Sequence, residues 1–200
     1  MVFESRKKER KNKLFNTKNI VGVFVILLMV TSVLGVFQGG SVVTKYNGFK
    51  IKQKDVNQYT LKINDKEYQF SFHPQNLEYI TIDPLLIQRI KNSKQQHLTF
   101  NHNDTFISEI ELTRFELQTK FPEEFEIYLD SGVTNNTAPY TTLPVITCDN
   151  ATETINVFYF TQGNETKIYE KGFCTIIQVQ SIYAVRETKE RLLYGLLGVI

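Results

Sequence analysis

"NGFKIKQKDVNQYTLKINDKEYQFSFHP", residues 47–74, has the clearest structural pattern in this chain of 200 residues. Apolar and polar side chains alternate, as in strands with one buried face. The alternating apolar positions form three runs: Phe49 and Ile51; Tyr59, Leu61 and Ile63; and Tyr68, Phe70 and Phe72. Only Asn64-Asp65 separates the last two runs, so a two-residue turn is expected, with Leu61 opposite Tyr68 and Lys62 opposite Glu67. The stretch predicts a three-stranded antiparallel meander with one apolar face.

Helix and strand signals follow the meander. Three helical patterns come after side chains that can cap a helix: residues 84–93 after Asp83, 105–121 after Asp104 and 182–200 after Ser181. Short apolar runs predict strands at residues 97–100, 125–129, 143–147, 156–160 and 174–179. Pro84 fits the first position of its helix, and Pro122 is expected to end the second helix. The strand–helix–strand order across residues 97–129 predicts a right-handed parallel crossover.

The final helix is expected to dock on the sheet. Its apolar stripe starts at Ile182, and Glu187 and Arg191 are expected to pair on its outer side. Residues 130–142 are expected to form a loop. The predicted fold class is α+β with α/β character: an N-terminal membrane helix, then one mixed-sheet domain with the three-stranded meander, the β-α-β crossover and a C-terminal helix packed on the sheet.

The positive charge of the chain is concentrated at its beginning. Residues 1–18 contain seven Lys or Arg and two Glu, a net charge of +5, whereas the remaining residues carry 16 cations and 19 acids, a net charge of −3. Nucleic-acid recognition needs a positive patch on the folded domain itself. We therefore expect no nucleic-acid partner.

Residues 20–37, "IVGVFVILLMVTSVLGVF", contain no charged side chain. A helix that crosses a bilayer needs about 20 apolar residues, and a cluster of cations keeps its own side in the cytoplasm. We therefore expect a basic cytoplasmic tail at residues 1–18, a transmembrane helix at 19–40 and an extracytoplasmic α/β domain at 41–200. A cleaved signal peptide and a pilin-like leader, cut just before the apolar run, are the alternatives.

Both cysteines, Cys148 and Cys174, lie in the part of the chain expected outside the cell, where thiols are not kept reduced. A disulfide between them would join two predicted strands. Closing a loop of this size stabilises a fold by about 3–4 kcal/mol in the chain-entropy model. Two buried free thiols are the alternative, and a metal pair is not expected because no Cys-x-x-Cys spacing is present.

Four Asn-x-Thr triplets follow the apolar run, and this is the acceptor pattern for N-glycosylation. They begin at Asn103, Asn135, Asn150 and Asn164. All four lie in turn-like stretches, which suits sugars attached to exposed loops. Asn and Thr also favour turns for their own hydrogen-bonding reasons, so unmodified turn residues explain the triplets equally well.

No catalytic, cofactor-binding or metal-binding motif is present. His73, His97 and His102 are scattered without metal-ligand spacing. There is no phosphate-binding glycine loop and no Gly-x-Ser-x-Gly. We therefore expect no cofactor and no metal. Tyr140, which follows Pro139 in the predicted loop, is the candidate for an exposed recognition aromatic.

The combination "PVITCDNAT…GNETKIY…CTIIQV…KERLLYGLLGVI" resembles small archaeal membrane-anchored proteins of unassigned activity. The resemblance implies a basic tail, one membrane helix and an α/β exterior with a cysteine pair. Its motifs are structural, so it implies no catalytic residue. Residues 144–200 are also similar to α/β modules of archaeal surface-layer proteins, although those modules have a glycine-rich approach before the cysteine and this chain has residues 143–147, "LPVIT".

These patterns predict a location more clearly than an activity. The first hypothesis is a non-enzymatic, single-pass membrane-tethered domain that binds another envelope protein or a surface polymer. The second is an exported enzyme, such as a hydrolase acting on surface glycans or peptides. The third is a subunit of a secretion or pilus-like assembly. Convergent acids in a pocket, or a His–carboxylate contact, would favour the enzyme, and an exposed aromatic or apolar patch would favour binding.

Overall fold

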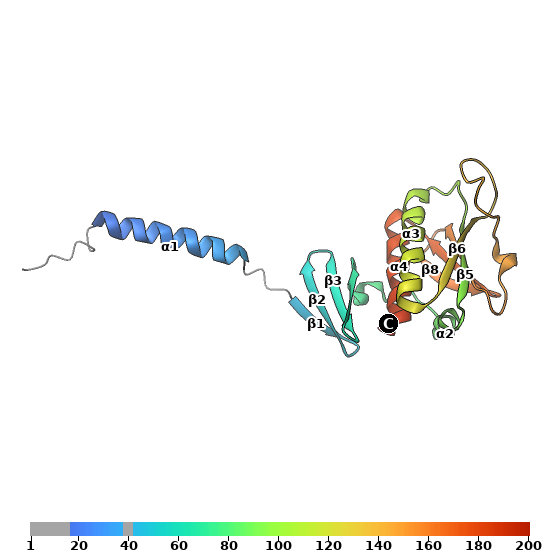
Figure 1. Ribbon diagram of the computed structural model, residues 1–200, viewed down its shortest axis with the longest axis horizontal. Coiled ribbons are helices and arrows are strands. Elements are labelled where there is room, and N and C mark those ends of the chain that lie inside the picture. Colours follow the sequence, from blue (N-terminus) through green and yellow to red (C-terminus); the bar gives the residue numbers. More distant parts are fainter. Residues whose placement is uncertain (1–16, 38–41) are drawn as a thin grey trace, which may run out of the picture. The chain divides into compact units, whose positions relative to one another are not determined.

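The computed structural model describes residues 17–37 and 42–200 of the chain (Figure 1). The chain divides into two units, the first ending at Ser41 and the second comprising Val42–Ile200. In the first unit, α1 (Thr17–Phe37) is a single helix. Its large apolar side chains from Ile20 to Val30 are all exposed.

The predicted membrane span at residues 19–40 is not confirmed. Within the described residues, no helix is both long enough and apolar enough to cross a membrane. Most of the predicted cytoplasmic tail, and residues 38–40 at the end of the predicted span, lie outside the described residues.

The first sheet of the second unit has four antiparallel strands in the order β1-β2-β3-β4. Their bounds are β1 (Val42–Tyr46), β2 (Phe49–Asp55), β3 (Gln58–Ile63) and β4 (Lys66–Phe70). The predicted register is confirmed, since Leu61 pairs with Tyr68 and Lys62 with Glu67. Sequence patterns missed β1, whose side chains are mostly exposed, so the predicted three-stranded meander is a four-stranded sheet.

The second sheet has five strands in the order β6-β5-β7-β9-β8, and only β8 is antiparallel to its neighbour. Their bounds are β5 (Gln95–Phe100), β6 (Tyr128–Val133), β7 (Val157–Gln162), β8 (Lys167–Lys171) and β9 (Cys174–Val179). The predicted parallel pairing of β5 with β6 is confirmed, but β6 starts later than the strand predicted at residues 125–129 and extends to Val133, into the segment predicted as a loop at residues 130–142. The predicted strand at residues 143–147 is wrong, since that segment makes only a single bridge from Val145 to Val133.

Three α-helices and two short 3-10 turns complete this unit: α2 (Pro84–Asn92), α3 (Ile107–Phe125), α4 (Ile182–Leu197), η2 (Pro74–Leu77) and η3 (Cys148–Asn150). The predicted caps at Asp83 and Ser181 are confirmed, because their side-chain oxygens accept from Leu85 N and Ala184 N. Pro122 does not end α3 as predicted. The helix continues to Phe125 and is followed by the C-cap residue Glu126, which has a left-handed φ of 56°.

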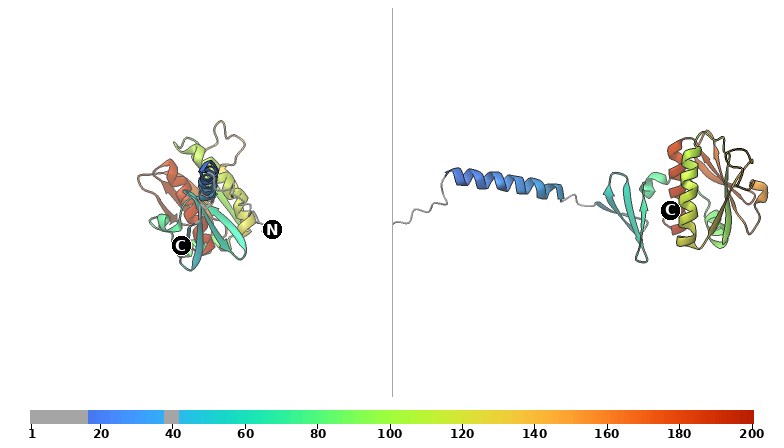
Figure 2. Two further views of the ribbon diagram at one scale, coloured as in Figure 1. Left: turned by 90° about the vertical axis from the view of Figure 1, so that its left-hand side faces the viewer. Right: turned by 45° about the horizontal axis from the view of Figure 1, so that its top comes forward.

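The second unit is built in three layers, with α3 and α4 between the two sheets (Figures 1 and 2). Helices α3 and α4 cover one face of the five-stranded sheet. The four-stranded sheet contacts α4 through Phe70, whose ring stacks on Tyr194 with 3.9 Å between ring centroids. Ile51 of one sheet and Phe158 of the other belong to the same hydrophobic core.

Packing on both sides of α4 overturns two predictions for this helix. Arg191 is buried and donates to the carbonyl oxygens of Ile80 (2.8 Å) and Ile200 (2.9 Å) instead of pairing with Glu187 on an outer face. Glu187 accepts from the Tyr79 hydroxyl at 2.5 Å. Ile182, expected in the apolar stripe, is 40% exposed. The side of α4 that the sequence indicates as solvent-facing is covered by the first sheet and its connection to α2.

Candidate functional site

The face of the five-stranded sheet opposite α3 and α4 carries the candidate site. Tyr159 of β7, Ile176 of β9 and Tyr169 of β8 are register partners and form a row across three strands. A groove of about 390 Å³ lies over this row, beside the cysteine pair, and we call it the disulfide groove. Its lining residues are Thr134, Thr147, Cys148, Asp149, Tyr159, Thr161, Tyr169, Lys171 and Ile176.

Successive residues of a strand point to opposite faces of the sheet, and this alternation decides which side chains of β7 line the groove. Phe158 and Phe160 of β7 point into the core shared with the helices. Val157 and Tyr159 therefore point to the other face, where they pack in a second cluster with Ile176. The apolar run at residues 156–160 predicts the strand that carries Tyr159, whereas β8 was not predicted, because "KIYEK" has too few apolar residues to signal a strand. The signal available for Tyr159 was its position next to Phe158 and Phe160 in this run, because neighbouring residues of a strand point to opposite faces.

The disulfide holds one wall of the groove. Cys148 and Cys174 are bonded, with 5.2 Å between their Cα atoms. Cys148 begins the turn η3 rather than a strand, so the disulfide joins a turn to β9. The prediction that it joins two strands is therefore wrong for the Cys148 side. Thr147 and Asn150 form a capping box around this turn, and Thr147 N donates to Asn150 Oδ1 at 2.8 Å. These constraints fix the position of Asp149 at the rim.

The groove combines a flat apolar floor with a polar rim. Tyr169 is 39% exposed, while Ile176 is almost completely buried between the two tyrosines. The rim presents the hydroxyls of Thr134 and Thr161, together with the charged side chains of Asp149 and Lys171. Such a site can stack a ring on its aromatic surfaces and hydrogen-bond the polar groups at the edge of the ring.

The histidines do not join this site. His97 Nδ1 lies 3.8 Å from Asp130 Oδ2, which is too long for a hydrogen bond, and neither residue lines the disulfide groove. His102 contacts Asn135 Oδ1 (2.8 Å) and the Thr137 hydroxyl (2.5 Å). His73 contacts Thr44, and burial lowers its pKa. Within residues 17–37 and 42–200, no three His, Cys, Asp or Glu side chains are grouped to hold a metal.

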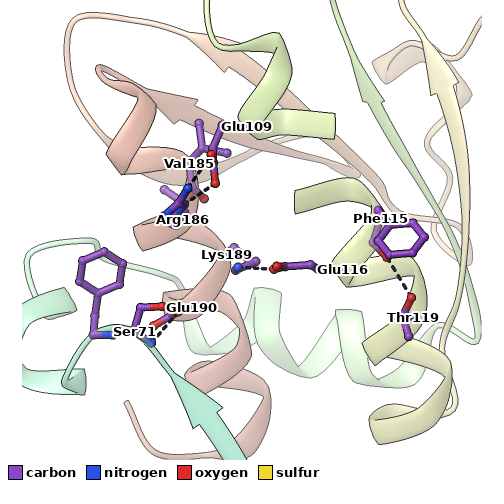
Figure 3. Close-up of polar contacts among 11 residues, drawn as sticks. Ser71, Glu109, Phe115, Glu116, Thr119, Val185, Arg186, Lys189 and Glu190 are labelled. Carbon is purple, nitrogen blue, oxygen red and sulfur yellow. Dashed lines mark hydrogen bonds and ion pairs between the residues drawn. The ribbon is translucent and has the colours of Figure 1, made fainter. Parts of the chain in front are cut away.

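Charged side chains between the helices have structural partners instead (Figure 3). Arg186 of α4 donates to both carboxylate oxygens of Glu109 on α3, at 2.5 and 3.0 Å, and Lys189 pairs with Glu116 one turn further along. Glu190 points the other way, toward the four-stranded sheet, and accepts from the backbone N–H of Ser71 (2.9 and 3.0 Å). These contacts join α4 to α3 within the middle layer and to the end of the four-stranded sheet.

Two of these carboxylates have shifted pKa values of opposite sign. The hydrogen bonds from Arg186 lower the pKa of Glu109. Burial raises the pKa of Glu190, although N–H donors from Ser71 and Phe72 oppose this effect. Both side chains have close protein partners, so their positions are those of residues that hold the fold together rather than of an acid–base pair facing a substrate.

The glycosylation candidates are all exposed. Asn103, Asn135 and Asn164 follow the carboxyl ends of β5, β6 and β7, so three distant parts of the sequence meet at one edge of the sheet. Asn150 lies in η3, beside the disulfide groove. Tyr140 is half-buried rather than exposed, and its ring packs edge-on against Phe100 at 5.7 Å.

Comparison with models of protein families, with curated proteins and with solved structures finds no match to this chain. The resemblance to archaeal membrane-anchored proteins and surface-layer modules therefore stays a prediction.

Proposed function

We propose that this chain is a membrane-tethered domain on the outer face of the cell envelope that binds a saccharide polymer of the cell surface. The binding site is the disulfide groove. The observation that carries the proposal is the row of Tyr159, Ile176 and Tyr169, which offers two aromatic side chains on either side of an aliphatic floor.

Several features of the chain support this location. The uncharged run at residues 20–37 follows a cluster of cations, the arrangement expected for an anchor with a cytoplasmic N-terminus. The disulfide fits an oxidising exterior. The Asn side chains of all four Asn-x-Thr triplets are exposed, which attachment of sugars would require.

The size and chemistry of the groove favour a saccharide over a protein surface. Its volume of about 390 Å³ lies near the lower end of the range for small-ligand sites, roughly 300–1,000 Å³. A sugar ring has an apolar face that stacks on tyrosine, while its hydroxyls match the Thr134 and Thr161 hydroxyls and the Asp149 carboxylate. Binding without cleavage is favoured because glycoside hydrolysis generally uses two carboxylates, and Asp149 is the only carboxylate among the residues that line the groove.

The test is a pair of tyrosine substitutions in the full chain. Tyr169→Ala removes an aromatic surface from the groove, whereas Tyr183→Ala removes a tyrosine that is 71% exposed on α4, on the opposite side of the sheet. Co-sedimentation with polysaccharide prepared from the cell envelope should show at least about a tenfold loss of affinity for Tyr169→Ala, equivalent to about 1.4 kcal/mol. Tyr183→Ala should bind like the wild type.

Three other outcomes would contradict separate parts of the proposal. Equal binding by Tyr169→Ala and the wild type would contradict a saccharide site in the groove. Shortening of the bound polymer over time would favour the exported hydrolase. Release of the chain from cell membranes by alkaline carbonate would contradict the membrane tether, independently of the binding result.

A further inference from the structure

The outer face of the four-stranded sheet is strongly basic. Ile51 and Leu61 are completely buried, so the residues beside them in β2 and β3 point to the opposite face. That outer face carries five exposed lysines, which we call the lysine face: Lys45, Lys50, Lys52, Lys54 and Lys62. The sheet forms one outer layer of the unit, so this face is turned away from α4 (Figure 2).

The lysine face differs in charge from the rest of the unit. Residues 42–72 contain six lysines and three acids, a net charge of +3, while residues 73–200 contain ten cations and sixteen acids, a net charge of −6. The net negative charge of the chain beyond its first 18 residues is therefore unevenly distributed, since residues 42–72 are net positive. The charge count that argued against a nucleic-acid partner does not hold for this part of the domain.

Few of these lysines are neutralised within the protein. Lys62 pairs with Asp65 at 2.8 Å, and Lys54 lies 3.9 Å from Glu67. Within residues 17–37 and 42–200, no carboxylate lies within ion-pair distance of Lys45, Lys50 or Lys52. Like charges on one sheet face repel, so an anionic partner would relieve this repulsion.

Two further features fit a lipid surface. Val43 lies on the same face, opposite Lys52, and is 57% exposed, while Val56 at the adjoining turn is 75% exposed. Apolar side chains among lysines suit the boundary between headgroups and acyl chains. At the same end of the sheet, Lys54, Gln58, Thr60 and Gln69 line a polar hollow of about 380 Å³, which is large enough for a phosphate headgroup.

We propose that the lysine face docks on anionic lipid headgroups of the membrane that holds the chain. This inference rests on the proposed membrane tether. Only four residues separate the end of the apolar run at Phe37 from Val42, the first residue of the sheet. For a chain that this run holds in the bilayer, lipid is a better match for the lysine face than a distant polymer.

The inference also gives the domain an orientation. The two sheets lie on opposite sides of α3 and α4 (Figure 1). The lysine face belongs to the outer side of the first sheet and the disulfide groove to the outer side of the second, so they face away from each other. A domain that rests on lipid through the lysine face presents the disulfide groove away from the membrane, toward the surface polymer.

The experiment uses the full chain reconstituted in two kinds of vesicle, pure phosphatidylcholine and an equal mixture of phosphatidylcholine with phosphatidylglycerol. A water-soluble amine reagent labels lysines, and peptide mapping gives the rate at each site. Labelling of Lys50 and Lys52 should fall several-fold in the anionic vesicles and recover in high salt, which screens the attraction. Lys91, an exposed lysine on α2, is the matched control and should react at one rate throughout.

Equal labelling of Lys50 and Lys52 in both vesicles would overturn the docking while leaving the tether intact. Flotation of the vesicles tests the tether separately, and a chain that floats with neither kind would contradict the tether and this inference together. A soluble anionic polysaccharide, added to the phosphatidylcholine sample, distinguishes the source of the negative charge. Protection by this polysaccharide without protection by phosphatidylglycerol would assign the lysine face to a polymer and overturn lipid docking.

Discussion

Glu109 and Glu190 are both buried carboxylates, yet their surroundings shift their pKa values in opposite directions. Glu109 is 7% exposed and receives two hydrogen bonds from the Arg186 guanidinium, which favour its charged form. Glu190 is 4% exposed and has no cation as its direct hydrogen-bond partner, so the loss of hydration dominates. Residues of one type therefore give opposite dependences of stability on pH.

Glu109→Gln tests the first of these effects. Because the pKa of Glu109 is lowered in the folded state, its stabilisation is present above the ordinary glutamate value of 4.5 and is lost as the pH falls through the folded pKa. We expect the variant to lose about 1 kcal/mol at neutral pH, a modest value because the Arg186 side chain is 48% exposed. Urea denaturation across acid pH should show this deficit disappearing, and Glu123→Gln, at an exposed position, is the control.

A deficit that stays constant down to the lowest pH would contradict this account. It would indicate that Glu109→Gln disturbs packing rather than a charge interaction.

Two of the three predicted caps are correct, but Asp104 does not cap α3, and predictions that depend on distant packing failed. Asp83 and Ser181 were predicted as caps because a capping residue acts on the next two or three N–H groups. Tyr140 was predicted to be exposed because it follows a proline in a loop, but Phe100, forty positions earlier, covers one side of its ring. Loop sequence contains no information about such a partner.

At the scale of elements, Glu190 connects α4 to the end of β4. Its carboxylate accepts from Ser71 N and from Phe72 N (2.9 Å), and both residues directly follow the strand. The neighbouring Tyr194 hydroxyl donates to the Phe72 carbonyl at 2.9 Å. One turn of α4 therefore satisfies the backbone groups where the first sheet ends and η2 begins.

Glu190→Gln should change the pH dependence with the sign opposite to Glu109→Gln. The raised pKa means that the folded state holds a proton that the unfolded state has released, so the wild type loses stability as the pH rises from 4.5 through the folded value. The variant cannot ionise and should gain stability relative to the wild type over this window. The melting temperatures of the variant and the wild type, measured across acid and neutral pH, test this prediction. A constant difference between the two melting temperatures at every pH would contradict it.

Elements with strong periodicity were predicted well, and those shaped by neighbours were not. The Leu61–Tyr68 register followed from a two-residue turn and alternation alone. In contrast, β8 has lysines at both ends and only one fully buried residue, Ile168, so its membership of the sheet depends on pairing with β9. Pro122 failed as a helix stop because, so close to the end of α3, its missing N–H costs only one bond.

At the scale of the whole molecule, the sequence predicted a mixed α+β domain but not its three layers. The strands before residue 72 and those after residue 95 were expected in one mixed sheet, whereas they form two sheets with helices between them. The sequence does not encode this separation in any single segment. It is visible at Glu190 of α4, whose buried carboxylate accepts from Ser71 N and Phe72 N at the end of the first sheet.

The disulfide should contribute strongly to the stability of the whole unit. It connects residues 26 positions apart and fixes the wall of the groove to β9. Replacing both Cys148 and Cys174 by Ser should lower the free energy of unfolding by about 3 kcal/mol in the chain-entropy model. Chemical denaturation measures the change, and the wild type in reductant should match the double variant. A difference of less than about 1 kcal/mol would mean that the folded unit does not depend on the bond.

The loop that this bond closes contains the exposed residues Asn164 and Glu165 in the turn between β7 and β8. A protease that cuts the chain at this turn would separate the cysteines onto two fragments that remain covalently attached. Such a nicked molecule would migrate as one band on a non-reducing gel and as two bands after a thiol is added. A cut at that site would therefore leave no piece free to diffuse away while the disulfide is intact.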